Sequence, residues 1–138
     1  MSEPLARRHL AAGWTALFVF VLLGATLEAL LAWKAPALVD SGIETRRTLW
    51  RLAHAHGTGL ALVQIAYGLT VQAAPRAADG LASGCLLAAM GLVPLGFFAG
   101  GISVHGVDPG IGVLLVPPGA VALLVGAARI AASLLRRA

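Results

Sequence analysis

The chain is poor in charged residues and has a single cysteine. Only 12% of its 138 residues are charged, whereas 59% are hydrophobic; soluble domains average about 25% charged and about 45–50% apolar residues. This composition excludes an ordinary soluble domain and predicts an integral membrane protein. One cysteine, Cys85, excludes an intramolecular disulfide and a two-cysteine redox centre. We expect Cys85 to act as a small buried hydrophobic residue.

The motifs of several enzyme and cofactor classes are also missing. The sequence contains no CxxC pair, HExxH zinc motif, GxSxG nucleophile turn, Walker A loop or CxxCH haem attachment site. Whether the protein is an enzyme is left open by these absences. The net charge of +4 does not indicate nucleic-acid binding, because the arginines flank apolar segments, where positive charge serves membrane topology and contact with anionic lipid.

Four apolar segments occupy most of the chain, and about 20 residues suffice for one helical span. The first exceeds the core of about 7–15 residues of a cleaved secretory signal, so we interpret it as a retained helix. Short links predict that sequential helices are antiparallel neighbours. We therefore predict an all-α integral membrane protein with one domain, residues 1–138, folded as a four-helix transmembrane up-down-up-down bundle. The predicted spans are residues 10–33, 48–73, 80–103 and 111–135.

Prolines and glycines modify the last two helices. Pro94 lies in the middle of the third segment and is expected to bend it. Gly96 and Gly100 form a GxxxG pattern, which permits close contact between membrane helices. From this pattern we predict self-association into a homo-oligomer. The pair Pro117-Pro118 leaves two possible starts for the fourth helix, near residue 111 or at Pro117 itself.

The distribution of Lys and Arg predicts the orientation. If the termini lie in the cytoplasm, the inner side carries Arg7, Arg8, Arg76, Arg129, Arg136 and Arg137, and the outer side carries only Lys34, Arg46, Arg47 and Arg51. This asymmetry predicts a multi-pass protein of the bacterial inner (cytoplasmic) membrane with both termini inside. Trp33 and Trp50 would mark the outer interface and Trp14 the inner one.

Five ionisable residues fall on the predicted outer side: Glu28, His54, His56, His105 and Asp108. At a rise of about 1.5 Å per residue, Glu28 lies about 7–8 Å inside Trp33, and His54 lies about 6 Å inside Trp50. Such groups are costly in a membrane, so their convergence is a hypothesis of a functional site.

Helical spacing predicts where these side chains point. His54 shares its face with Gly57, Thr58, Ala61 and Gly68. Small residues line faces that meet other helices, so we expect His54, and Glu28 by the same argument, to point into the bundle. His56 falls on a different stripe and is expected to have a different role.

Imidazole and carboxylate ligands suit zinc, copper or iron, and histidine also serves as an axial haem ligand. We therefore predict a metal or haem site with Glu28, His54 and His105 as leading ligands, completed by His56 or Asp108. Structural alternatives remain open. Glu28 could form a salt bridge with Lys34, Arg47 or Arg51, His54 could make an interhelical hydrogen bond, and the His105–Asp108 stretch could be a turn in which Asp108 caps the fourth helix.

Two further functions compete with this one. The first is an oligomeric transporter or channel subunit for a small solute, protons or a cation, with Gln64, Thr70 and Gln72 extending a polar path. The second is a structural subunit of a larger membrane complex. The outer basic residues Lys34, Arg46, Arg47 and Arg51 would bind anionic lipid headgroups or an anionic substrate group. The sequence predicts contact with the lipid bilayer and does not identify a small-molecule or protein partner.

Overall fold

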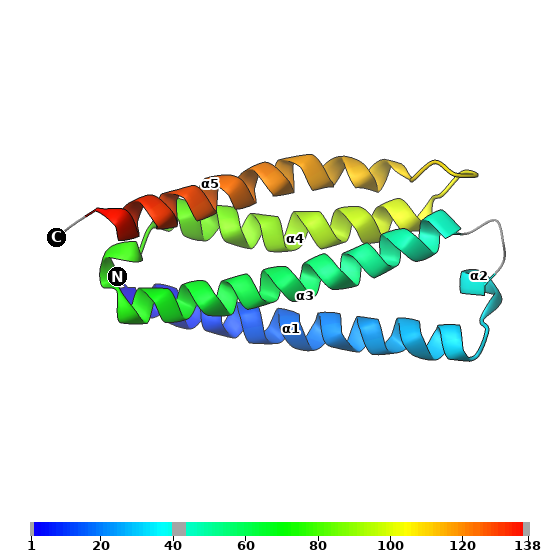
Figure 1. The fold of residues 1–138 in the computed structure, drawn as a ribbon, viewed down its shortest axis with the longest axis horizontal. Coiled ribbons are helices and arrows are strands. Elements are labelled where there is room, and N and C mark those ends of the chain that lie inside the picture. The colour runs from blue at the N-terminus through cyan, green and yellow to red at the C-terminus, as the bar shows by residue number, and fades with distance from the viewer. Residues whose placement is uncertain (1, 40–43, 137–138) are drawn as a thin grey trace.

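The computed structural model describes residues 2–39 and 44–136, and its regular structure is helical (Figure 1). The long helices are α1 (Ser2–Ala32), α3 (Glu44–Ala73), α4 (Gly80–Ile102) and α5 (Val116–Leu135). The short ones are α2 (Pro36–Val39) and the 3-10 turns η2 (Pro75–Ala77) and η3 (Ile111–Leu115). The predicted all-α, up-down arrangement of four long helices is confirmed. Arg137, used in the orientation argument, lies outside the described residues.

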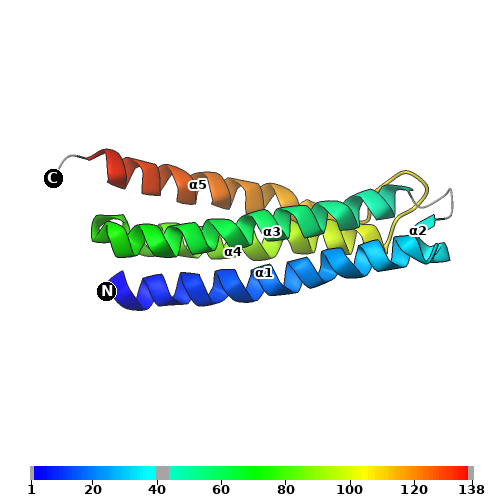
Figure 2. The same ribbon diagram turned by 60° about the horizontal axis from the view of Figure 1, so that its bottom comes forward.

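The four long helices form an open row. Figure 1 shows α1, α3, α4 and α5 in that order across the molecule, and Figure 2 keeps α1 and α5 on opposite sides. The main packing joins sequence neighbours: α1 with α3, α3 with α4, and α4 with α5. Both termini and η2 lie at one end, called here the terminal end. The α2 turn and the loop between α4 and η3 lie at the other, called the loop end (Figure 1).

Three helical segments are long and apolar enough to cross a membrane: α1, α4, and the stretch Ile111–Leu135 formed by η3 and α5. By helix length and hydropathy, the chain is a multi-pass membrane protein. The more polar helix α3 is not among the three, and the histidines His54 and His56 lie on it. It nevertheless packs in the row between α1 and α4.

Three helix starts differ from prediction, and one of them is that of α3, which begins at Glu44, four residues before the predicted residue 48. The first helix begins at Ser2, about two turns before the predicted start at residue 10. The α-helical part of the fourth segment begins at Val116, one residue before the predicted start at Pro117. Residues Ile111–Leu115, where the other predicted start lay, form the 3-10 turn η3. Pro117 and Pro118 occupy the first turn of α5, where the missing backbone N–H groups have no helical partner to lose.

Glycines allow α1 and α3 to approach closely. A Cβ placed on Gly13 would lie 2.9 Å from the backbone oxygen of Ala61 and 2.6 Å from Cγ1 of Ile65. A Cβ on Gly68 would lie 2.9 Å from Cγ of Leu10. No side chain fits at Gly13 without moving the backbone of α3, so these two helices are packed through their glycines.

Gly96 and Gly100 have a partner within the chain. A Cβ on Gly96 would lie 2.9 Å from Cγ2 of Val116, and one on Gly100 would lie 3.3 Å from the backbone nitrogen of Val113. The GxxxG pattern therefore packs α4 against η3 and α5. This face of α4 is already covered within the chain and does not support the expected contact with a second copy. Self-association into a homo-oligomer stays a prediction.

Candidate functional site

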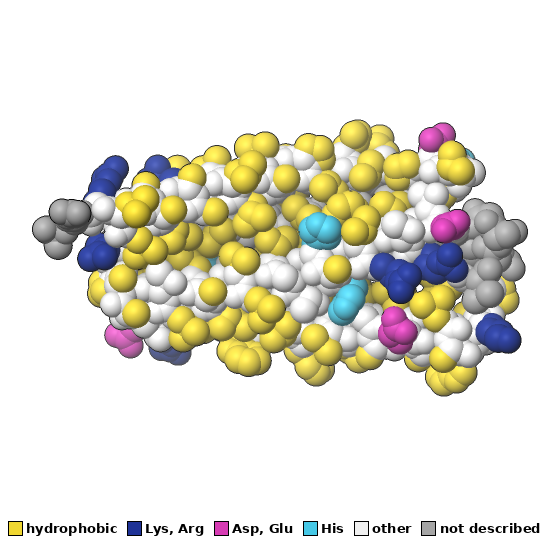
Figure 3. Space-filling model, in the orientation of Figure 1, with side chains coloured by type: hydrophobic (Ala, Val, Ile, Leu, Met, Phe, Trp, Pro, Cys, Tyr) yellow, Lys and Arg dark blue, Asp and Glu magenta, His cyan; other side chains and the backbone are white. Residues whose placement is uncertain are grey.

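The five ionisable residues predicted to converge do not form a compact ligand set. Among residues 2–39 and 44–136, no group of three or more His, Cys, Asp or Glu side chains is placed to hold a metal ion. Figure 3 shows histidine side chains midway along one broad face of the row, with acidic and basic side chains toward the loop end. The position of each residue follows from its own helix.

His54 lies half-buried between α3 and α1. Its Nδ1 is 2.7 Å from the backbone oxygen of Phe20. Because a carbonyl only accepts hydrogen bonds, Nδ1 carries the proton and donates. The ring occupies the space that a side chain on Gly24 would need. Interhelical hydrogen bonding, one of the alternatives for this residue, is therefore present, and the partner is the backbone of Phe20.

His56 points to the other side of α3. Its Nδ1 donates to the backbone oxygen of Leu52 at 2.9 Å, within the same helix. Its ring lies 4.9 Å from the ring of Phe97 on α4, with an angle of 41° between the planes. The side chain is exposed. The two histidines thus diverge, His54 toward α1 and His56 toward α4.

Glu28 is exposed on α1, one turn beyond Gly24 on the same helix face. Gly24 touches His54, so Glu28 lies next to the His54 contact on its loop-end side. In the described part of the chain Glu28 makes no hydrogen bond or ion pair. Of the cations considered as its partners, Arg47 instead pairs with Glu44 at 3.8 Å.

His105 and Asp108 close a tight turn at the loop end. Their backbone N–H and C=O groups pair reciprocally at 3.1 Å in both directions. Gly106 between them has φ +62°, a conformation that favours glycine. The expected capping role of Asp108 is wrong, because the cap residue of η3 is Gly110 and no side chain bonds to that cap. Both side chains are exposed.

Two members of the outer basic cluster have contacts: Arg47 pairs with Glu44 within α3, and Arg46 reaches α4. Nε of Arg46 donates to the backbone oxygen of Gly101 at 3.0 Å, and its guanidinium lies 5.9 Å from the ring centroid of Trp50. Trp50 in turn donates to the backbone oxygen of Phe98 at 3.1 Å. Arg46 and Trp50 therefore tie the start of α3 to the end of α4, whereas Lys34 and Arg51 are exposed.

The buried polar centre of the molecule lies near the terminal end, where sequence reasoning placed no site residue. His9, Gln64 and Ser83 are 0%, 0% and 2% exposed, and they come from α1, α3 and α4. Nδ1 of His9 is 2.5 Å from Oε1 of Gln64, and Nε2 of His9 is 2.7 Å from Oγ of Ser83. One imidazole therefore joins three helices.

The hydrogen-bond roles in this network are determined by its geometry. The amide nitrogen of Gln64 donates to the backbone oxygen of Leu86 at 2.7 Å, so Oε1 of Gln64 faces His9 and accepts from Nδ1–H. In neutral His9, Nε2 then accepts from the Ser83 hydroxyl. Both ring nitrogens are satisfied, as a buried polar group requires. The ring of Tyr67 meets that of His9 edge-on, with centroids 4.7 Å apart.

A second polar cluster ties the helix ends together at the same end of the row. Oδ1 of Asp79 caps α4 by accepting from the backbone N–H groups of Leu81 and Ala82 at 2.9 and 3.0 Å. Oδ2 accepts from Arg129 of α5 at 2.8 and 2.6 Å. The hydrogen bond from Arg129 is the main cause that lowers the pKa of Asp79, and the cap bonds add to it. The hydroxyl of Tyr67 accepts from the backbone N–H of Asp79 at 3.1 Å.

The signal that could have identified His9 was present in the sequence. Ala6 and Gly13 lie three residues before and four residues after His9, on its helix face. Small residues on one helix face predict contact with another helix, as they do for His54. The predicted span began at Leu10 and therefore left His9 outside the membrane, beside Arg7 and Arg8.

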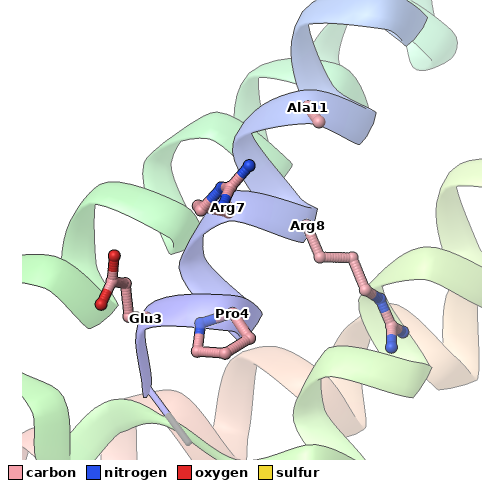
Figure 4. A pocket seen from close by; sticks show the side chains of 5 residues that line it. All are labelled: Glu3, Pro4, Arg7, Arg8 and Ala11. Carbon is pink, nitrogen blue, oxygen red and sulfur yellow. The ribbon is translucent and has the colours of Figure 1, made fainter.

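A surface hollow beside α1 is open and does not form an enclosed site. It has a volume of about 600 Å³ and lies beside the first turns of α1. Figure 4 shows that its lining side chains, among them Arg7 and Arg8, all come from this one helix and extend away from each other. A hollow with one wall offers no convergent contacts to a ligand.

Comparison of the chain with family models, characterised proteins and solved structures finds no match.

Proposed function

We propose that His54 and His56, which point to opposite sides of α3, bind haem or a transition metal ion (zinc, copper or iron) within the membrane. The observation that carries this proposal is the state of the two imidazoles. Each donates Nδ1–H to a backbone carbonyl, Phe20 or Leu52. This bond orients the ring and leaves the lone pair of Nε2 as the coordinating atom, which is how ligating histidines are usually held.

The depth of Glu28 and His56 in the membrane supports the proposal that a bound group covers these side chains. Glu28 and His56 are exposed in the structure, yet both lie about 7–9 Å inside the tryptophan positions that mark the interface. A charged group at the centre of a bilayer costs about 2.5–3.5 kcal/mol, and such residues normally face protein, ligand or water. A face that exposes a carboxylate and an imidazole is therefore better suited to contact with a bound cofactor or metal ion than with lipid tails.

Within that proposal, haem is preferred over a bare metal ion. A structural zinc site needs about four protein ligands, and the described residues bring no three candidate ligands together. Haem iron needs only one or two axial ligands. Because His54 and His56 point to opposite sides of α3, each would serve a separate iron or pair with a ligand from another chain.

The test is reconstitution of the purified chain with haem. Wild-type protein in mild detergent should shift the Soret band of added haem and retain it through gel filtration. Loss of the band in His56→Ala or His54→Ala would identify the ligand. His105→Ala, in the exposed turn, is the matched control and should behave as wild type. Elemental analysis for zinc, copper and iron tests the alternative ions. If neither haem nor metal is retained, the proposal is wrong.

A structural role in a larger membrane complex is the second candidate, and the exposed Glu28 favours it. A partner helix would cover the carboxylate and both histidines without any cofactor. Spin labels distinguish the cases after Cys85→Ser. A label at Ala55, exposed between the histidines, should be shielded from oxygen if protein covers this face. A label at Leu124, exposed on α5, should stay lipid-accessible.

Transport has less support from the contacts. Gln64, expected on a polar path, is buried with both ends of its amide bonded. Thr70 bonds to its own helix at Ala66, and Gln72 is exposed. Access of a water-soluble relaxation agent to the Ala55 label would nevertheless favour a water-filled cavity and hence the transporter alternative.

A further inference from the structure

An apolar groove runs between α3 and α5 over α4. Because α5 packs on α4 and not on α3, the row leaves this groove open along one face. It has a volume of about 320 Å³, with Val63, Tyr67 and Thr70 on one wall, Leu86 on the floor, and Ile130 and Leu134 on the other wall. In Figure 3 hydrophobic side chains line a hollow between the helices in the terminal half.

The groove ends at a cluster of cations. Nη2 of Arg76 donates to the backbone oxygen of Leu134, a groove residue, at 3.5 Å. Arg136 follows Leu134 by two residues and lines a separate small hollow of about 120 Å³ with Asp79 and Arg129. Arg129 already pairs with Asp79. Arg76 and Arg136 make no ion pair among the described residues, so the mouth of the groove carries excess positive charge.

The size of the groove decides what it can hold. Its α3 wall runs from Val63 to Thr70, about 10 Å at a rise of about 1.5 Å per residue. That length fits within one leaflet of a hydrocarbon core about 30 Å thick. A helix about 10 Å across would need roughly 800 Å³ over the same length, well above the 320 Å³ available. A single hydrocarbon chain is narrow enough to enter.

We infer that this groove binds one acyl chain of an anionic phospholipid, whose phosphate contacts Arg76 and Arg136. An apolar slot with cations at its membrane-interface end is complementary to such a lipid in both shape and charge. Basic pockets between membrane helices on the cytoplasmic side bind anionic headgroups in this way. The groove lies toward the terminal end, whereas histidine side chains lie midway along the row (Figure 3), so this inference does not rest on the proposed cofactor site.

Native mass spectrometry of the full chain tests this inference, with phosphatidylglycerol and phosphatidylcholine as probes. The wild type should retain phosphatidylglycerol preferentially. Each of Arg76→Gln and Arg136→Gln should weaken its binding about fivefold, which corresponds to about 1 kcal/mol per cation. Arg51→Gln, at the loop end, is the matched charge control and should have no effect.

A second pair of variants tests the groove itself. Ala131→Phe places a ring in the groove, since Ala131 lines it, and should abolish lipid retention. Ala128→Phe, exposed on α5 outside the groove, should not. Equal binding of the two lipids, or no effect of the arginine variants, would overturn the inference. So would unchanged retention in Ala131→Phe, or a wild-type dimer that Ala131→Phe dissociates, since the occupant would then be a second copy.

Discussion

The hydroxyl of Ser83 lies 2.7 Å from Nε2 of His9, joining residues 74 positions apart. This bond links α1 directly to α4, although the main packing of the row runs from α1 through α3 to α4. Gln64 of α3 holds the other side of the same ring. The network therefore fixes three helices at the terminal end, next to the apolar cluster that contains Ala6, Tyr67 and Leu86.

The His9–Ser83 contact should contribute measurably to stability. Ser83→Ala leaves Nε2 of His9 buried without a partner, and we expect a loss of about 1–3 kcal/mol in the free energy of unfolding. His9→Leu removes the other partner, so the double variant should lose less than the sum of the two single changes. Detergent-unfolding titrations measure the cycle. Ser133→Ala, whose hydroxyl bonds only to its own helix, is the control; strict additivity would contradict the coupling.

Acid should loosen the junction between α4 and α5. The pKa of Asp79 is lowered in the folded protein by Arg129, so its contribution to stability is complete above its unfolded pKa of about 3.9. That contribution is lost as the pH falls through the lower, folded pKa. Unfolding titrations from pH 7 to pH 2 should show this loss in the wild type. Asp79→Asn should lack it, and an identical acid profile in the variant would rule out Asp79 as the cause.

The close packing of α1 against α3 should depend on Gly13. In Gly13→Ala the new methyl group would meet the backbone oxygen of Ala61 at 2.9 Å. We expect a destabilisation of about 1–3 kcal/mol, as for other overpacked sites. Gly59→Ala provides the control, because its Cβ would meet nothing within 4 Å and alanine is the better helix former. Thermal unfolding in one detergent compares the two. Equal effects would mean that the tight contact is not needed.

Both chain ends should lie on the cytoplasmic side. The termini lie at the same end of the row (Figure 1), and the arginine-rich terminal end is expected inside by the positive-inside rule. Fusions of alkaline phosphatase to each terminus should be inactive, and fusions of a fluorescent protein that matures only in the cytoplasm should be bright. An active phosphatase at either end would reverse the orientation and place the phospholipid groove in the outer leaflet.

Sequence reasoning was most successful where hydrophobic length determines structure. The number of long helices and the ends at Ala73 and Ile102 agree with prediction to within one residue. The start of α1 was missed because the predicted span began with the apolar run at Leu10, whereas a helix can continue beyond its apolar core. The length of the apolar segments does not indicate whether the four helices form a closed bundle or an open row. The groove between α3 and α5 was therefore not predicted.

The candidate site was harder to predict than the fold. Helical spacing correctly placed His54 and His56 on different stripes of α3. The expectation that Glu28 points into the bundle is wrong, because its side chain is exposed on α1. His9 was missed because it appeared to be outside the membrane. A polar side chain near a helix end can be exposed or fully buried, and only the packing of the neighbouring helices decides which.

The open row also bears on how the chain is assembled during synthesis. Each long helix after the first packs against the long helix that precedes it in the chain, so one of its docking partners is already present when it leaves the ribosome. Contacts between near neighbours in sequence form quickly, because little chain has to be ordered to make them. The His9–Ser83 bond is the exception: it closes only after α4 has entered, and so secures the first three long helices once they are all in place.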